Sequence, residues 1–159
     1  MNKLHETPRR TAANLLGATA FAFATALFAS AGFAQGAGSP VGLWKNIDDE
    51  TKQPKSLVRI VEKDGVLTGK VEKILTEKTD AKCDKCTDER KDQPVQGMTI
   101  ITGMKRDGDK WEGGKILDPN NGKVYSSQMK LVDGGKKLEV RGYVGTPMLG
   151  RTQTWIREQ

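Results

Sequence analysis

The chain has 159 residues, enough for about one domain, and carries a net charge of +6 with two cysteines and a single histidine. Its basic residues alternate with acidic ones and form no one-sided basic patch of the kind that nucleic-acid-binding proteins use, so we expect no nucleic-acid partner. The histidine, His5, lies in a segment that we expect to be removed, which excludes Ser-His-Asp and Cys-His catalysis from the rest of the chain and removes the commonest transition-metal ligand.

The first element is a secretory signal peptide at residues 1–34. A basic start is followed by an apolar run at 15–28 and then by small residues before Gln35. The apolar run is shorter than the ~20 residues of a membrane-spanning helix, which favours a cleaved signal over a membrane anchor and predicts no membrane insertion. We predict cleavage near Ala34, with Ala31 as a second site, and a periplasmic or secreted product. Cleavage lowers the net charge from +6 to +4 because it removes Lys3, Glu6, Arg9 and Arg10.

The rest of the chain is predicted to be a flexible arm at 35–40 and a single domain at 41–159. Apolar and polar residues alternate with a period of two in short segments, separated by turn signals such as Asp64-Gly65, and no segment has a sustained helical stripe. Eight strands are predicted: Val41–Ile47, Ser56–Glu62, Val66–Leu75, Pro94–Lys105, Trp111–Leu117, Lys123–Val132, Lys137–Tyr143 and Arg151–Arg157.

This pattern indicates an all-β fold. Short strands with regularly spaced turns are typical of a sandwich or a barrel, and hairpin-length connections favour an antiparallel up-and-down order. Glycines inside the strands, such as Gly69 and Gly142, fit the bends of a small barrel. Eight strands enclose enough room for packed side chains or for one small ligand.

The longest connection, residues 76–93, holds both cysteines, Cys83 and Cys86. A Cys-x-x-Cys pair forms a structural disulfide, a redox-active pair or half of a metal site. No βαβ unit accompanies it, and a zinc site needs about four ligands, so a disulfide that pins the loop is favoured. The segment Asp118–Gly122 lacks the ligand spacing of a calcium loop and is predicted to be a turn. We expect no metal and no cofactor.

The two ends of the predicted domain carry a recognisable pair of motifs. Gly42-Leu43-Trp44 opens the first strand, and the segment Gly150–Arg157 closes the last. A Gly-x-Trp on the first strand with an arginine on the last resembles the signature of the lipocalin-like (calycin-like) barrels. The resemblance implies that an arginine, here Arg151 or Arg157, stacks on the Trp44 indole and helps to close one end of the barrel.

The whole segment from Val41 to Arg157 also resembles bacterial exported proteins of the domain of unknown function family 2147. This resemblance implies a lipocalin-like barrel and leaves the activity open. The matching motifs are Gly42–Trp44, Asp48–Thr51, Ser56–Ile60, Cys83–Cys86, Pro94–Met98, Gly114–Pro119, Gly122–Tyr125, Val140–Tyr143 and Gly150–Trp155.

Six residues are candidates for ligand binding: Trp44, Arg59, Trp111, Tyr125, Arg141 and Arg151. An arginine that faces the barrel interior is a buried cation that needs a partner, which a carboxylate ligand would supply. Arg141 is the first choice for this role if its face of the strand is the inner one. The alternative is that all three arginines point outward into solvent.

These observations predict a non-catalytic periplasmic or secreted protein that binds a small apolar or amphipathic molecule. The alternative is an envelope protein-interaction or stress module whose barrel is filled by its own side chains. An enzyme that uses carboxylates or tyrosine is a third, less favoured reading. The sequence does not determine the ligand or the oligomeric state.

Overall fold

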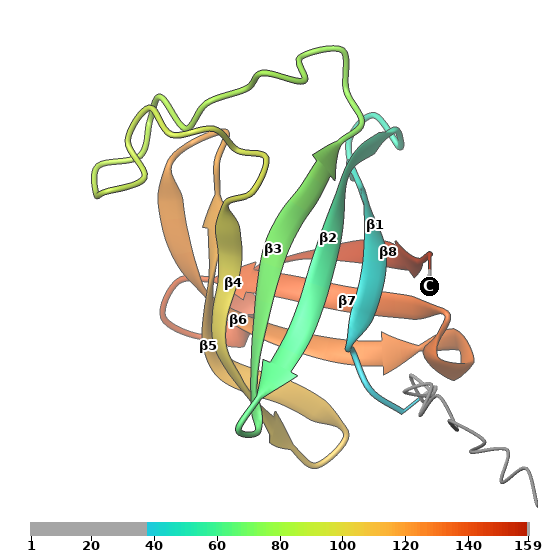
Figure 1. Ribbon diagram of the computed structural model, residues 1–159. Coiled ribbons are helices and arrows are strands. Elements are labelled where there is room, and N and C mark those ends of the chain that lie inside the picture. Colours follow the sequence, from blue (N-terminus) through green and yellow to red (C-terminus); the bar gives the residue numbers. More distant parts are fainter. Residues whose placement is uncertain (1–37, 159) are drawn as a thin grey trace, which may run out of the picture. The chain divides into compact units, whose positions relative to one another are not determined.

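The computed structural model describes residues 38–158, which form one closed antiparallel barrel of eight strands. Each strand pairs with its neighbour in sequence, and the last strand returns to the first (Figure 1). The predicted signal peptide and its cleavage site lie outside the described residues. The elements are β1 (Gly42–Ile47), β2 (Pro54–Lys63), β3 (Val66–Ile74), β4 (Thr99–Asp107), β5 (Lys110–Asp118), β6 (Lys123–Val132), the 3-10 turn η1 (Asp133–Gly135), β7 (Lys137–Tyr143), the 3-10 turn η2 (Pro147–Leu149) and β8 (Arg151–Arg157).

The all-β class, the eight strands and their up-and-down order are confirmed. The fourth strand begins at Thr99 and not at Pro94 as predicted. Pro94 instead forms an isolated bridge with Lys82, and the Val95 amide donates to the Ala81 carbonyl at 2.8 Å. The predicted start of this strand therefore pairs within the long loop and not within the barrel.

The hairpin between β2 and β3 shows how local sequence sets the register. Asp64 and Gly65 both adopt positive φ angles, 53° and 75°, as the tight turn between right-twisted strands requires. The turn pairs Lys63 with Val66, so Ile60 lies opposite Gly69. Both of these positions then face the barrel interior.

One half of the barrel interior is filled by the chain's own side chains. Alternate positions of the strands supply the fully buried residues Trp44, Val58, Ile60, Leu67, Ile101, Met104, Met129 and Leu138. Apolar burial of this kind is the main stabilising contribution to a fold. This packed half holds the strands in place around the other half.

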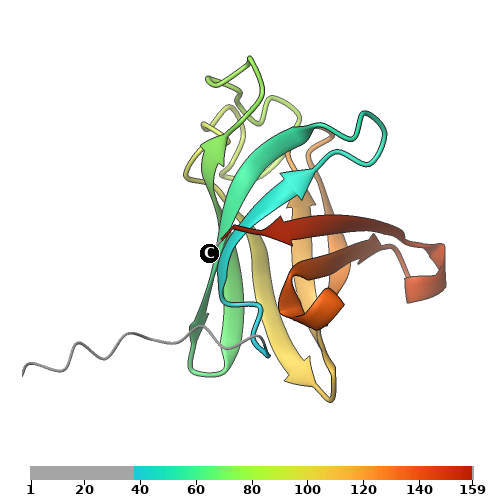
Figure 2. The same ribbon diagram turned by 90° about the vertical axis from the view of Figure 1, so that its right-hand side faces the viewer.

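The packed end is closed where the first and last strands meet. β1 pairs with β8 through Trp44 and Arg157, and Figure 2 shows the two strands side by side. The Trp44 indole donates a hydrogen bond to the Pro40 carbonyl at 2.7 Å. Arg157 donates to the Ser39 carbonyl at 2.7 Å. Ser39 and Pro40, predicted as part of a flexible arm, are thus held against the barrel.

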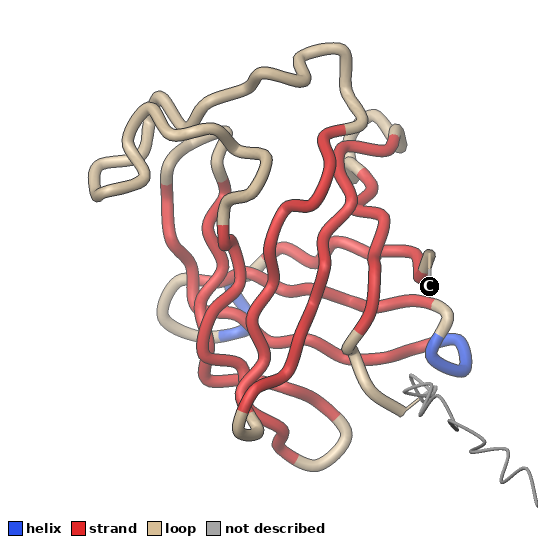
Figure 3. Tube along the Cα trace, in the orientation of Figure 1, coloured by secondary structure: helices blue, strands red, loops and turns tan. Residues whose placement is uncertain are grey.

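The long loop between β3 and β4 arches over the opposite end of the barrel (Figure 3). Its two cysteines are buried and form the predicted disulfide, with an S–S distance of 2.00 Å. The Cys83–Cys86 turn lies against the β5–β6 turn, where Gly122 has a φ angle of +70° and an added Cβ atom would overlap the Lys85 carbonyl. The absence of a side chain at Gly122 allows the two turns to touch.

Within residues 38–158, no helix is long and apolar enough to cross a membrane.

Candidate ligand cavity

The open half of the barrel contains a cavity of about 970 Å³. Its wall is built from the ends of β1, β3, β5 and β7 and the beginnings of β2, β4, β6 and β8, which all lie at the same end of an up-and-down barrel. The long loop between β3 and β4 adds one side of the mouth. A volume of this size falls within the range of small-molecule sites in proteins.

The floor of the cavity is apolar. Its apolar side chains come from five strands: Val71, Ile74, Ile100, Ile116, Val140 and Trp155. Trp155 is the largest of them, and its indole donates a hydrogen bond to the Gln153 side chain at 3.3 Å. Such a floor favours an aliphatic or aromatic group over a charged one.

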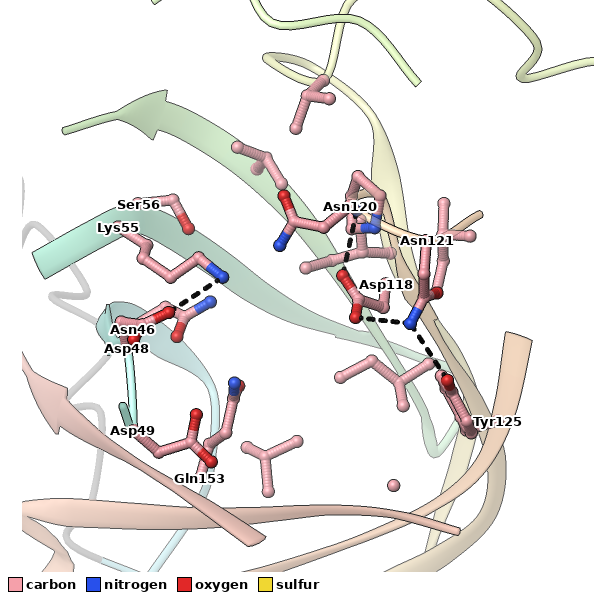
Figure 4. Close-up of a pocket in the computed structure, with 18 of the residues that line it drawn as sticks. Asn46, Asp48, Asp49, Lys55, Ser56, Asp118, Asn120, Asn121, Tyr125 and Gln153 are labelled. Atoms are coloured by element: carbon pink, nitrogen blue, oxygen red, sulfur yellow. Dashed lines mark hydrogen bonds and ion pairs between the residues drawn. The ribbon is translucent and has the colours of Figure 1, made fainter. Parts of the chain in front are cut away.

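A tier of uncharged polar side chains lies above this floor (Figure 4). Asn46, Ser56 and Gln153 come from β1, β2 and β8. Asn121 and Tyr125 come from the β5–β6 hairpin on the other side of the cavity. These groups present amide and hydroxyl dipoles to whatever occupies the space between them.

The hydrogen bonds on the β5–β6 side form a short chain. The Asn121 amide donates to the Asp118 carboxylate at 3.0 Å and to the Tyr125 hydroxyl oxygen at 3.1 Å. The second Asp118 oxygen accepts the Asn120 backbone amide at 3.0 Å. Asp118 thus folds its own turn back toward the cavity, as a carboxylate at the start of a turn commonly does.

Three ion pairs line the opposite side of the mouth. Lys55 lies 3.3 Å from the Asp48 carboxylate. Arg151 pairs with Asp49 and lies 3.1 Å from Glu50. These arrangements link the β1–β2 connection to the starts of β2 and β8.

Hydrogen bonding keeps the carboxylates of Asp48 and Asp49 ionised. The Thr51 backbone amide is the largest influence on Asp48 and lowers its pKa to about 2. Burial raises the pKa of Asp49, but the hydrogen bond and the charge of Arg151 outweigh it, and the net pKa lies below its ordinary value. Asp48 and Asp49 are therefore ionised at neutral pH.

One polar atom of the wall has no partner within residues 38–158. The Asn46 side-chain oxygen is shielded from solvent and accepts no hydrogen bond. Buried polar atoms are usually hydrogen-bonded, because an unsatisfied one costs free energy. Ser127 has a similarly unpartnered hydroxyl, but it lies outside the cavity wall, on β6 opposite Gly142.

Two of the six predicted site residues, Tyr125 and Arg151, line the cavity. Trp44 lies outside the cavity wall and under the Arg157 guanidinium, whose carbon is 4.2 Å from the indole centroid. The stacking partner left open between Arg151 and Arg157 is thus Arg157. Trp111 is buried in the packed half, with the Arg106 guanidinium 5.5 Å from its ring.

The other two arginines lie outside the cavity. Arg59 pairs with Glu72 on the outer surface at 2.6 Å. The inward orientation considered for Arg141 is corrected: Leu138 and Val140 take the inner face of β7, and Arg141 takes the outer one. There it donates to the Pro147 carbonyl at 2.6 Å and to the Thr152 hydroxyl at 2.7 Å.

Several cavity residues were not among the sequence candidates. Gln153 and Trp155 share the inner face of β8 with Arg151, and Asn46 shares the inner face of β1 with Trp44, so the period-two alternation would have found them. Asp118 and Asn121 carry no such signal, because their position depends on how the turn folds. Within the described part of the chain, no three His, Cys, Asp or Glu side chains are grouped as metal ligands.

Comparisons with known proteins agree with this architecture. Residues 42–157 match a family described as "Uncharacterized protein conserved in bacteria (DUF2147)". The barrel is similar to the solved structure of protein HP1028 from the human pathogen Helicobacter pylori, which is described as belonging to the lipocalin family. The TM-score is 0.67 at 17% sequence identity, over 76% of this chain and 84% of the other. No curated protein matches the chain in sequence. At this identity the likeness concerns the fold alone.

Proposed function

The chain belongs to the DUF2147 family of uncharacterized bacterial proteins, and from this premise we propose that it is a non-catalytic binding protein for a small apolar or amphipathic molecule. The molecule occupies the open half of the barrel. Its apolar part lies on the floor against Trp155 and Val140, and any polar part reaches the tier that contains Tyr125. We further propose that the protein acts in the periplasm or as a secreted protein.

The observation that carries this proposal is the division of the barrel into a packed half and an open half. A barrel that served only as a scaffold would be filled throughout, since empty apolar space forfeits packing energy. Here a cavity of about 970 Å³ lies above a floor of buried apolar side chains. Sites with an apolar lining and a few convergent polar groups are typical of small-molecule binding.

Mass spectrometry of the intact protein under native conditions tests the proposal directly. The protein is purified after expression with its own first 34 residues, so that it meets its natural compartment. We expect a mass excess that disappears on denaturation, and extraction identifies the released molecule. A native mass equal to that of the bare chain, together with no binding of aliphatic probes, contradicts the proposal.

A cavity-filling substitution provides the matched control. Val140 is 2% exposed and lies on the floor, so Val140→Phe occupies ligand volume. Val61 is 48% exposed on the outer face of β2, and Val61→Phe makes the same chemical change away from the cavity. We expect at least a tenfold loss of affinity for an aliphatic probe in the first variant and none in the second. Equal affinities in the two variants would place the bound molecule elsewhere.

A further inference from the structure

The cations of the inner cavity wall are already paired with carboxylates. Lys55 is paired with Asp48, and Arg151 with Asp49 and Glu50. Arg157, which is partly buried, lies outside the cavity wall and donates to three backbone carbonyls. Among the described residues, no cation of the inner wall is left to receive a negatively charged ligand.

The other basic residues of the wall are at the mouth. Lys78, Lys82 and Lys85 belong to the loop between β3 and β4, where they are exposed and alternate with Asp80 and Asp84. Solvated charges of alternating sign contribute little net attraction. They do not form the inner anchor that a carboxylate would need.

An anionic head group would also be repelled by Asp118, which lies beside the polar tier. Asp118 faces the cavity and is hydrogen-bonded to Asn121 and Asn120 without a cationic partner in the described chain. Like charges brought together away from water repel each other strongly. A cationic head group would be attracted by Asp118, but it has no lone pair and would leave the Tyr125 O–H without an acceptor on the ligand.

The tier instead offers hydrogen-bonding capacity to an uncharged group. The shielded Asn46 oxygen has no partner, so it is an acceptor for a donor on the ligand. The Tyr125 oxygen already accepts a hydrogen bond from Asn121, which leaves its O–H free to donate. Ser56, on β2, adds a hydroxyl that both donates and accepts.

We propose that the ligand is an aliphatic molecule with an uncharged head group that donates hydrogen bonds, such as an alcohol, a glyceride or a carboxamide. This inference rests on the proposed function and narrows it to one ligand class. The tail lies on the apolar floor, and the head group donates to the Asn46 oxygen and accepts from the Tyr125 hydroxyl. A free fatty acid is excluded at neutral pH by its charge.

A series of ligands with the same tail separates these alternatives. Decanamide, 1-decanol, methyl decanoate, decanoate and decylammonium are titrated against the wild-type protein at neutral pH. Tryptophan fluorescence and calorimetry report binding. We expect decanamide and decanol to bind about tenfold more tightly than methyl decanoate, which accepts hydrogen bonds but donates none, and than either ion. Tighter or equal binding of the ester, the acid or the amine overturns the inference.

Two variants locate the head group. Asn46→Leu removes the acceptor at similar volume, and we expect it to reduce the preference for decanamide over methyl decanoate to about twofold. Gln128→Leu makes the equivalent change on the outer face of β6 and should keep the tenfold preference. An unchanged preference in folded Asn46→Leu overturns the assigned acceptor, and the wild-type series decides the ligand class even if this variant does not fold.

Different results would contradict the binding function and the head-group selectivity. If no member of the series binds and the native mass shows no bound molecule, the binding function itself is wrong. If all members bind with similar affinity and Val140→Phe abolishes binding, the cavity is a binding site but its head-group selectivity is wrong.

Discussion

At the scale of single residues, Arg157 has the most demanding environment in the barrel. Its guanidinium stacks on Trp44 and donates to the carbonyls of Gly135, Val41 and Ser39 at 2.7, 3.0 and 2.7 Å. Burial lowers its pKa, which is the expected effect of desolvation on a cation. The stacking contact and the three hydrogen bonds offset this cost of desolvation. Because Ser39 and Val41 lie at the start of the domain, the Arg157 side chain joins its two ends.

Removal of this side chain should therefore cost more than removal of an exposed arginine. We expect Arg157→Met to lower the free energy of unfolding by about 2–4 kcal/mol, because it leaves shielded carbonyls without donors and uncovers the indole. Arg59→Met, which loses only the outer pair with Glu72, should cost at most about 1 kcal/mol. Urea unfolding measures both, and equal losses would mean that Arg157 contributes no more than a surface charge.

A second residue-scale prediction concerns acid stability. Asp48 accepts hydrogen bonds from the Thr51 and Glu50 backbone amides, and its pKa falls from 3.8 to about 2. A carboxyl with a depressed folded-state pKa stabilises the fold above its unfolded pKa and loses this contribution as pH falls through the folded one. Asp48 should thus stabilise the protein fully above about pH 4 and progressively less toward pH 2.

Melting temperatures of the wild type and of Asp48→Asn between pH 2 and pH 6 test this expectation. The variant should be less stable than the wild type near neutral pH, and the two curves should converge as the medium becomes acidic. Curves that stay parallel over the whole range would show that the ionised form of Asp48 does not contribute.

At the scale of elements, the contact between the disulfide loop and the β5–β6 turn shapes the mouth of the cavity. The Cys83 sulfur lies 3.6 Å from the Pro119 carbonyl oxygen. Gly122 packs against the Lys85 backbone. The disulfide spans only three positions, so the chain-entropy model gives it about 2 kcal/mol at most. Its main effect is to fix the shape of the loop that docks on this turn.

Gly122→Ala should detach this loop. Gly108→Ala is the matched control, since Gly108 also has a positive φ angle, +60°, but has nothing near an added Cβ atom. Both variants should lose the ~1–2 kcal/mol of a left-handed non-glycine residue. Only Gly122→Ala should also make residues 76–93 sensitive to limited proteolysis. Equal sensitivity in the two variants would contradict the docking contact.

The same elements show what the sequence could predict. The strands were predictable because their inner faces alternate strictly, as Leu138 and Val140 do on β7. The same alternation places Arg141 on the face opposite these two residues. An inward Arg141 would have required Leu138 and Val140 to face solvent. The position of Pro94 was not predictable, because its bridge partner Lys82 belongs to a loop whose shape depends on the disulfide.

The candidate site was predictable only in part, for a related reason. The floor is made by strand residues with a fixed period, so Trp155 follows from the pattern that places Arg157. Asn121 of the polar tier and the neighbouring Asp118 are held at the cavity by the hydrogen bonds of their own turn. Such contacts depend on three-dimensional geometry that no local pattern encodes.

At the scale of the whole molecule, residues 38–158 combine a packed half with an open one in a single continuous sheet. The buried cluster around Trp44 supplies apolar packing that the open half lacks. A domain whose total stability is about 5–15 kcal/mol tolerates such a cavity only if the rest is well packed. The barrel thus combines a packed core and an open cavity in one sheet.

The prediction at this scale concerns the form of the protein in the cell. From the basic, apolar and small-residue order of residues 1–34, we expect a mature protein that starts at or near Gln35 and is released from bacteria by mild disruption of the outer envelope. Amino-terminal sequencing of the released protein measures the cleavage site. Recovery of the full-length chain from the membrane fraction would contradict the signal peptide.

The pairing of the first strand with the last has a consequence for the order of events during folding. Each strand from β2 to β7 pairs with the next strand along the chain, whereas the hydrogen bond from Arg157 to Val41 joins residues 116 positions apart. Contacts of such long range form late, because the chain loses more entropy in bringing them together. β8 is the last strand to be synthesised. Until it is in place, β1 and β7 are unpaired edge strands that can pair with other chains. The barrel is therefore closed in one last step. A chain that lacks β8 is left as an open sheet in which β1 and β7 are unpaired edge strands.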